Sequence, residues 1–328
     1  MWFAQLQVSV SRGGAYGVDL FFALSAYLIT ELLLREREEQ GSLDIRSFYV
    51  RRILRIWPLY YLFIAACVVV PFLNPLRAFG FHYVVGFIFL AGNWSTIAFG
   101  PPEFAGLPLW SVSAEEQFYL LWPLIIRRLS RRGIGVAAVL MIVVANLTRL
   151  AVLLQHGIGW SVWANTFARL DPMAIGILIA LFLRGRTLDF GLPLRASLLG
   201  AGILGIIATG HFAAPWGDGL PWAGTLISYP VIALCSGALL FGTIGIGLRL
   251  RPIEYLGKIS YGLYVYHQMC IWITDRVLHV RNGVFHMCLR EGVALGITIL
   301  VSSVSYAVLE KPFLNLKRRF TYVGSRPV

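Results

Sequence analysis

The stretch IGVAAVLMIVVANLTRLAVLL, residues 134–154, is apolar at almost every position and long enough to cross the hydrocarbon core of a bilayer. Eight further apolar stretches of similar length follow the same pattern, at 18–34, 56–73, 81–99, 166–183, 192–210, 223–248, 259–278 and 287–309. The chain is 58% hydrophobic and 13% charged, with a mean hydropathy of +0.72, which is unlike a soluble globular domain. We therefore expect an all-α, polytopic transmembrane bundle with about nine spanning helices.

The basic residues alternate between successive loops. Five stretches hold 21 of the 28 Lys and Arg residues, at 35–55, 127–132, 184–195, 249–258 and 311–326. The positive-inside rule places these stretches, and the C-terminus with them, in the cytosol. The net charge of +12 therefore indicates orientation in the lipid bilayer, and we expect no nucleic-acid partner.

A tenth apolar piece, 118–126, is too short to span by itself. If it crossed, the arginines at 127–132 would lie on the wrong side, so we expect 100–133 to form a cytoplasmic re-entrant or interfacial segment. Residues 1–16 show neither a signal-peptide pattern nor a span, which predicts a short N-terminal tail. No linker divides the rest, which predicts one membrane domain over 17–312 and a basic cytoplasmic tail over 313–328.

The four cysteines occur singly, without paired spacing, so we expect neither a disulfide framework nor a metal site. Ionisable residues at membrane depth are costly, and they mark functional or structural contacts. Asp19, in GVDLFFALSAYLIT, lies in the first turn of a helix, where it either interacts with the helix dipole or orients a catalytic base. Arg52 and Arg55, in FYVRRILRIWPLYY, share a helical face. They are either positive-inside flanks or a clamp for the phosphates of a cytosolic donor.

Two further stretches contain candidates for proton transfer. In LPLWSVSAEEQFYLLWPL, Glu115 adjoins an apolar run beside Tyr119. A carboxylate at such a boundary is either a proton carrier or one half of a structural pair with Arg52, Arg55 or Arg127. In ISYGLYVYHQM, His267 is either a packing residue with a hydrogen bond or a group suited to proton transfer near neutral pH.

Three other ionisable residues favour a structural role. Arg169 and Asp171 occur in FARLDPMAIGILIA, and Glu310 occurs in YAVLEKPF. We expect them to form ion pairs that hold helices together.

Six stretches together resemble the acyltransferase-3 family, in the order GVDLFFALSAYLIT, RRILRIWPLYY, LWSVSAEEQFYLLWP, FARLDPMAIGILIA, ISYGLYVYH and LEKP. These are integral-membrane acyltransferases of the polysaccharide O-acetyltransferase type, and the match is collinear over residues 17–312. The resemblance implies transfer of an acyl group, expected to be acetyl, from cytosolic acyl-CoA to a hydroxyl of a cell-surface glycan or lipid-linked saccharide. It implies acyl-CoA (acetyl-CoA) as co-substrate, no permanently bound cofactor, and the bacterial plasma membrane as location.

The family's first helix begins with an Arg and ends in a His that acts as the base, and no such segment precedes Gly17. The resemblance implies that Asp19 orients this base and that Glu115 shapes the donor site near Tyr119.

For the remaining site residues, the resemblance implies that Arg52 and Arg55 hold the CoA phosphates or polarise the carbonyl. His267 is then the remaining imidazole candidate at membrane depth. These groups are expected to line one polar cavity reached from the cytosol. Two alternatives stay open: a truncated, catalytically silent membrane protein of the same fold, and a transporter, which would show paired half-sequences with broken helices.

Overall fold

The computed structural model describes residues 2–73, 80–155, 159–184, 190–213, 222–246, 250–278 and 284–320. These residues form helices joined by turns and contain no β-strand, so the all-α prediction is confirmed for them. The chain folds into two compact units, each built from segments that are distant in sequence. The first combines Met1–Leu43 with Ala114–Gly247, and the second combines Asp44–Ser113 with Leu248–Tyr322.

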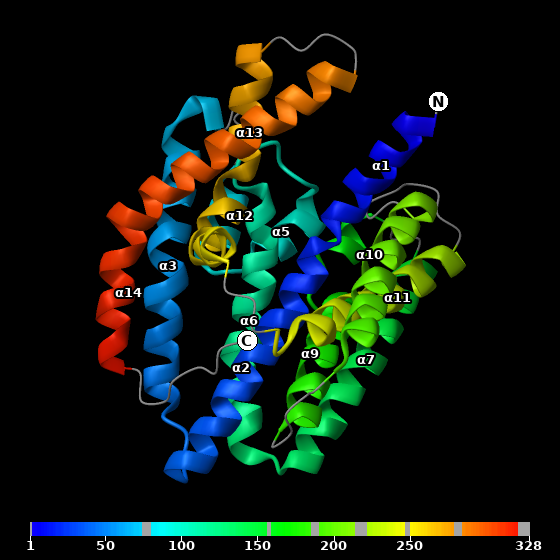
Figure 1. Cartoon of the computed structure of the whole chain (residues 1–328). Helices are drawn as coiled ribbons and strands as arrows, with labels where there is room; N and C mark the ends of the chain where they lie inside the picture. The colour runs from blue at the N-terminus through cyan, green and yellow to red at the C-terminus, as the bar shows by residue number, and fades with distance from the viewer. Residues whose placement is uncertain are drawn as a thin grey trace. The chain divides into compact units, whose positions relative to one another are not determined.

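The first unit is a bundle of helices. Its elements are α1 (Trp2–Ala15), α2 (Gly17–Gln40), α6 (Trp110–Arg128) from Ala114 onward, α7 (Arg131–Leu154), α8 (Trp160–Trp163), the 3-10 turn η3 (Phe167–Arg169), α9 (Leu170–Leu183), α10 (Leu192–Phe212) and α11 (Trp222–Thr243). Only Tyr16 separates α1 from α2, and the two helices follow one line in Figure 1. Gly41 ends α2 with φ 71°, a left-handed conformation that glycine adopts without a side-chain clash.

Small residues allow α2 and α9 to pack closely. A Cβ built at Gly176 of α9 would lie 2.1 Å from the backbone oxygen of Ala23 on α2. Ala23 and Ala26 are fully buried, so α2 also presents small side chains. Van der Waals contact between small residues is a main source of helix association in membranes, where the surrounding lipid is itself apolar.

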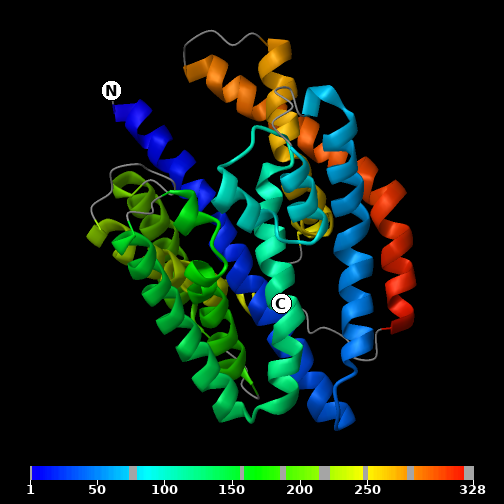
Figure 2. The same cartoon turned by 180° about the vertical axis from the view of Figure 1, so that it is seen from behind.

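The second unit contains the remaining described helices. They are α3 (Ile45–Val69), η1 (Pro71–Leu73), α4 (Phe81–Ile88), α5 (Gly92–Phe99), η2 (Leu107–Leu109), α12 (Arg251–Leu278), α13 (Val284–Ser305), the π-helical turn η4 (Tyr306–Glu310), α14 (Lys311–Lys317) and η5 (Arg318–Phe320). Asp44 caps α3, because its carboxylate accepts a hydrogen bond from the backbone N–H of Ser47 at 3.0 Å. α14 packs beside α3, as the opposite views of Figures 1 and 2 both show.

Six helical segments within the described residues are long and apolar enough to cross a membrane. They are Val8–Gln40, Ile45–Val69, Arg131–Leu154, Leu192–Phe212, Gly224–Thr243 and Phe285–Lys317. The predicted count of about nine spans is therefore not confirmed. One expected span, 81–99, is broken into α4 and α5, because Leu90 between them has φ 56° and a helix cannot continue through that conformation.

Two other segments form helices. Residues 2–15, expected as a tail, form α1 and pack against α10, where a Cβ at Gly210 would lie 2.5 Å from the backbone nitrogen of Gly13. The apolar piece 118–126 lies inside α6, a continuous helix of 19 residues. α6 is not among the six candidate spans, and the re-entrant or interfacial placement of 100–133 stays a prediction.

Candidate active site

The predicted site residues are divided between the two units. Asp19, Glu115 and Tyr119 belong to the first unit, whereas the second unit contains Arg52, Arg55 and His267. Each unit contains its own polar cluster, and the prediction of one cavity shared by all six residues stays a prediction.

Asp19 forms a buried ion pair in the first unit. It lies in the first turn of α2, and its Oδ2 accepts a hydrogen bond from Nη2 of Arg169 at 2.8 Å. The Arg169 side chain is 0% exposed and the Asp19 side chain 1%, so both charges are removed from solvent. A buried carboxylate requires such a partner, and the helix dipole alone does not account for Asp19.

A second buried ion pair involves Asp171, two residues after Arg169 in the chain. Arg149 of α7 donates from Nη1 to Asp171 Oδ1 at 3.2 Å and from Nη2 to Asp171 Oδ2 at 3.0 Å. Its Nη1 also donates to the backbone oxygen of Ala168 at 2.6 Å. The two-pronged geometry holds α7 against the start of α9. The predicted ion pairs of Arg169 and Asp171 are thus confirmed, with Asp19 and Arg149 as their partners.

Aromatic rings surround the two guanidinium groups. The Cζ atom of Arg169 lies 4.3 Å from the ring centroid of Trp163 and 4.9 Å from that of Tyr229. Arg149 also contacts Tyr229, with Cζ 5.4 Å from the centroid. Tyr16 packs edge-on against both rings. These faces attract the cations and exclude water, which strengthens each electrostatic interaction inside the cluster.

Glu115 begins a hydrogen-bonded chain that links α6 to α2. Tyr119 donates from its hydroxyl to Glu115 Oε1 at 3.0 Å. Since that proton is used, the Tyr119 oxygen accepts from Ser25 Oγ in the short hydrogen bond between them. Glu115 and Tyr119 are 3% and 4% exposed, so the buried Tyr119 side chain connects the Glu115 carboxylate to α2. Beside it, Thr166 donates to Gln117 at 2.7 Å.

In the second unit, His267 has a defined tautomer. Its Nδ1 lies 2.6 Å from the backbone oxygen of Tyr264, so Nδ1 is assigned the proton and Nε2 the lone pair. The Tyr264 hydroxyl donates to Pro108 O at 2.8 Å and accepts from Ser111. His267 is half-buried, and this arrangement makes Nε2 available as a proton acceptor.

Arg52 and Arg55 belong to a larger basic cluster in the second unit. α14 packs along α3 and brings Lys317 into the electric field of both arginines and of Arg51. Arg51 fixes the segment after α14, donating from Nη1 to the backbone oxygen of Phe320 at 2.7 Å. Glu310 offsets part of the positive charge at Arg55, and a bound anion offsets more of the repulsion among the cations. The arrangement is therefore suited to phosphate groups.

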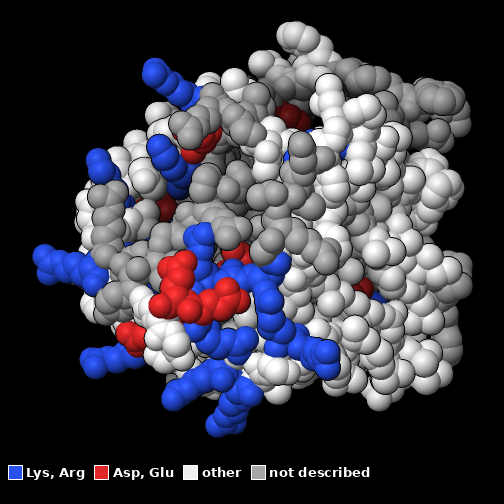
Figure 3. Space-filling view, turned by 60° about the horizontal axis from the view of Figure 1, so that its bottom comes forward, with Lys and Arg blue, Asp and Glu red and all other residues white. Residues whose placement is uncertain are grey.

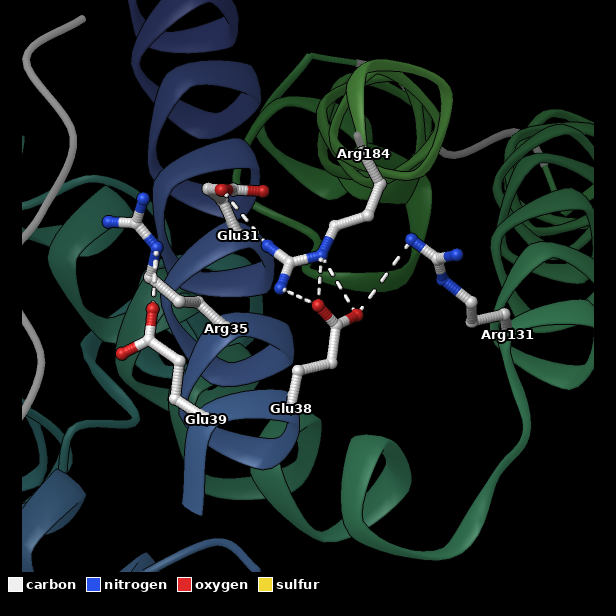
Figure 4. Close-up of polar contacts among 6 residues, drawn as sticks. All are labelled: Glu31, Arg35, Glu38, Glu39, Arg131 and Arg184. Atoms are coloured by element: carbon white, nitrogen blue, oxygen red, sulfur yellow. Dashed lines mark hydrogen bonds and ion pairs between the residues drawn. The ribbon is translucent and has the colours of Figure 1, made fainter. Parts of the chain in front are cut away.

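A further group of ion pairs lies nearer to solvent, at the C-terminal end of α2. Figure 4 shows its members, which are Glu31, Arg35, Glu38, Glu39, Arg131 and Arg184. Arg184 joins Glu31 at 3.0 Å and also bonds Glu38, which tethers the end of α9 to α2. Figure 3 shows acidic side chains surrounded by basic ones on the face turned forward. Because Glu38 is 50% exposed, this network is best explained as a solvated structural tether.

Two charged residues of these clusters were not singled out in the sequence. Arg149 is the single charge in the apolar stretch 134–154, and a charge at that depth was a sufficient signal. Lys317 lies in a stretch of five basic residues that the positive-inside rule already explained, and only the packing of α14 distinguishes it.

Comparison with known proteins identifies related chains. A family model described as an acyltransferase domain matches residues 1–308. The putative peptidoglycan O-acetyltransferase YrhL of Bacillus subtilis is 30% identical, covering 94% of this chain and 51% of that protein. Peptidoglycan O-acetyltransferase OatA of Listeria monocytogenes is 28% identical, over 96% and 54% respectively. O-acetyltransferase OatA of Staphylococcus aureus is 27% identical, over 92% and 52%.

The chain spans about half the length of the curated relatives it matches. No solved structure shows significant similarity to it.

Proposed function

The chain belongs to the acyltransferase-3 family, and we propose that it is a membrane-embedded O-acyltransferase. It moves an acetyl group from cytosolic acyl-CoA to a hydroxyl of a cell-surface glycan. The family match supports the reaction class, and the names of two relatives support a glycan of the peptidoglycan type as acceptor. The apolar helices support an integral membrane location, which we assign to the bacterial plasma membrane.

The hydrogen-bonded chain from Glu115 through Tyr119 to Ser25 carries the proposal. A hydroxyl attacks a thioester efficiently only when a base takes its proton. Glu115 is a buried carboxylate whose hydrogen bond runs through Tyr119 to a second helix. A chain of exchangeable hydrogens suits proton movement. We therefore assign Glu115 and Tyr119 to the handling of the acceptor proton.

The basic cluster of the second unit binds the acyl donor. Arg52 and Arg55, with Arg51 and Lys317, hold the phosphates of acyl-CoA. The positive-inside rule puts this cluster and the C-terminus in the cytosol, where acyl-CoA is found. His267, with Nε2 available, is the second candidate for a base.

Transfer of radiolabelled acetyl groups tests the proposal. The full chain, reconstituted in liposomes, is incubated with labelled acetyl-CoA and solubilised peptidoglycan fragments, with dextran as the comparison acceptor. We expect alkali-labile acetyl ester on the peptidoglycan fragments. The Glu115→Gln side chain keeps an oxygen that accepts the hydrogen bond from Tyr119, but the amide cannot take a proton. The kcat should therefore fall about 10²–10⁴-fold.

Glu38→Gln is the matched control, because Glu38 is half-exposed and lies in the solvated tether. Its kcat should equal that of the unsubstituted chain. Absence of ester on both acceptors would contradict the proposed activity, and intact labelled acetyl-CoA accumulating inside the liposomes would favour a transporter. Full activity in Glu115→Gln would exclude the proton role assigned to Glu115 but would leave the proposed acyl transfer standing.

A further inference from the structure

Arg169 has hydrogen-bond donors that its ion pair does not use. A guanidinium carries five N–H bonds, and Nη2 of Arg169 donates to Asp19. Within the described part of the chain, Nε and Nη1 of Arg169 are buried and reach no acceptor. A buried donor left unpaired has lost its hydrogen bonds to water without replacement, and folded proteins rarely retain one without a reason. The unused donors therefore indicate a missing acceptor.

The neighbouring arginine shows what a purely structural role looks like. Arg149 uses both Nη atoms on Asp171 and also bonds Ala168 O, so Nε is its one orphan atom within the described residues. Arg169 instead bonds Asp19 through Nη2 and interacts with the Tyr229 side chain, while its Nε and Nη1 meet no acceptor in hydrogen-bonding geometry among the described residues. An arginine that served only to hold α2 would gain from the two-pronged geometry that Arg149 adopts.

The surroundings of Arg169 define the chemistry of the missing acceptor. Trp163 and Tyr229 contact the guanidinium through their rings, and the unused N–H groups donate in its plane. The two carboxylates of the cluster balance its two guanidinium charges, so a full anion is not required. A neutral oxygen that gains negative charge during a reaction matches these conditions. We propose that Nε and Nη1 of Arg169 bind the carbonyl oxygen of the transferred acyl group, an inference that rests on the proposed function.

This assignment gives Arg169 a defined step. The acceptor oxygen bonds to the acyl carbon, and the carbonyl π electrons move onto the carbonyl oxygen, which becomes an oxyanion. When the oxyanion collapses, the carbon–sulfur bond breaks, and the proton lost by the hydroxyl ends on the CoA sulfur. The products are an ester and a thiol. Fixed donors in a dry site stabilise the oxyanion more than the neutral carbonyl, which raises kcat. Asp19 is then a positioning residue for the guanidinium.

Arg169→Lys and Arg149→Lys form the test pair in the reconstituted full chain. Lysine keeps the positive charge beside Asp19 but loses the planar fork. We expect Arg169→Lys to lower kcat about 10²–10³-fold, as removal of an oxyanion donor does. Its KM for acetyl-CoA should change less than about threefold, because the donors act mainly in the transition state. Arg149→Lys should lower the unfolding temperature and keep kcat within about tenfold, because it loses only a structural fork.

Infrared spectroscopy provides a readout that does not depend on turnover. The carbonyl band of bound acetyl-CoA labelled with ¹³C at the carbonyl should move to lower frequency in the unsubstituted chain and in Arg149→Lys, but not in Arg169→Lys. If Arg169→Lys does not fold, Asp19→Asn with Arg169→Gln removes both charges together, and the same loss of kcat and of the band shift is expected.

Activity of the unsubstituted chain separates the two claims. An inactive unsubstituted chain overturns the proposed function and this inference with it. An active chain whose kcat and carbonyl band are unchanged by Arg169→Lys overturns the assignment of Arg169 alone.

Discussion

Replacing Gly176 by alanine tests whether close packing of α2 on α9 holds the first unit together. The added Cβ would lie 2.1 Å from the backbone oxygen of Ala23, 2.9 Å from its carbonyl carbon and 3.0 Å from the backbone nitrogen of Tyr27. All three obstructing atoms belong to the α2 backbone, so no side-chain rotation relieves the clash. The two helices must therefore separate by roughly 1 Å at this point to restore ordinary contact.

The expected loss of stability follows from two opposing effects. Overpacking a close contact costs about 1–3 kcal/mol, and a rigid backbone obstacle places this site at the upper end. Alanine also regains about 1 kcal/mol of helix propensity over glycine. We therefore expect Gly176→Ala to lower the free energy of unfolding by about 1–2 kcal/mol.

The separation should also weaken catalysis. Arg169 lies two turns before Gly176, and its bond to Asp19 crosses between the same two segments. Acetyl transfer should therefore fall along with stability.

Thermal unfolding in detergent micelles provides the assay. Tryptophan fluorescence reports unfolding of the first unit, because Trp122 and Trp163 are buried there. Gly200→Ala in α10 is the matched control, since a Cβ there meets nothing within 4 Å. It should raise the free energy of unfolding by about 0.5–1 kcal/mol. Equal unfolding temperatures for the two variants would refute the close-packing argument.

Two further predictions concern groups nearer to solvent. Arg184→Ala removes the shared partner of Glu31 and Glu38 and should cost about 1 kcal/mol, whereas Arg35→Ala should cost less than about 0.5 kcal/mol. Thermal unfolding at low and high salt checks this, and no difference between the variants at low salt would contradict it. Hydrogen bonds from the Ser47 side chain and backbone lower the pKa of Asp44, so its contribution to stability is present above about pH 4 and is lost as pH falls through the lower folded value. Asp44→Ala should cost about 1 kcal/mol at pH 7 and less at pH 2, and an equal loss at both pH values would exclude the charged cap.

The class of protein was readable from local sequence. A bilayer imposes a length of about 20 apolar residues on each spanning helix, and the chain repeats such stretches. The resemblance rested on six short motifs in collinear order, and the family match confirms it. The three-residue spacing of Arg52 and Arg55 also indicated one helical face, because 3.6 residues make a turn. These features depend on neighbours in the chain, so sequence alone determined them.

The contacts that build the candidate site depended on packing. Asp19 and Arg169 are 150 residues apart, and no local pattern identifies them as partners. They meet because Gly176 lets α9 approach α2 and because η3 turns Arg169 into the bundle. The break at Leu90 likewise divided an apolar stretch that hydropathy treats as continuous. Hydropathy measures the preference of each segment for lipid, whereas the partner of a buried charge is chosen by the shape of the surfaces around it, and only the tertiary structure contains that information.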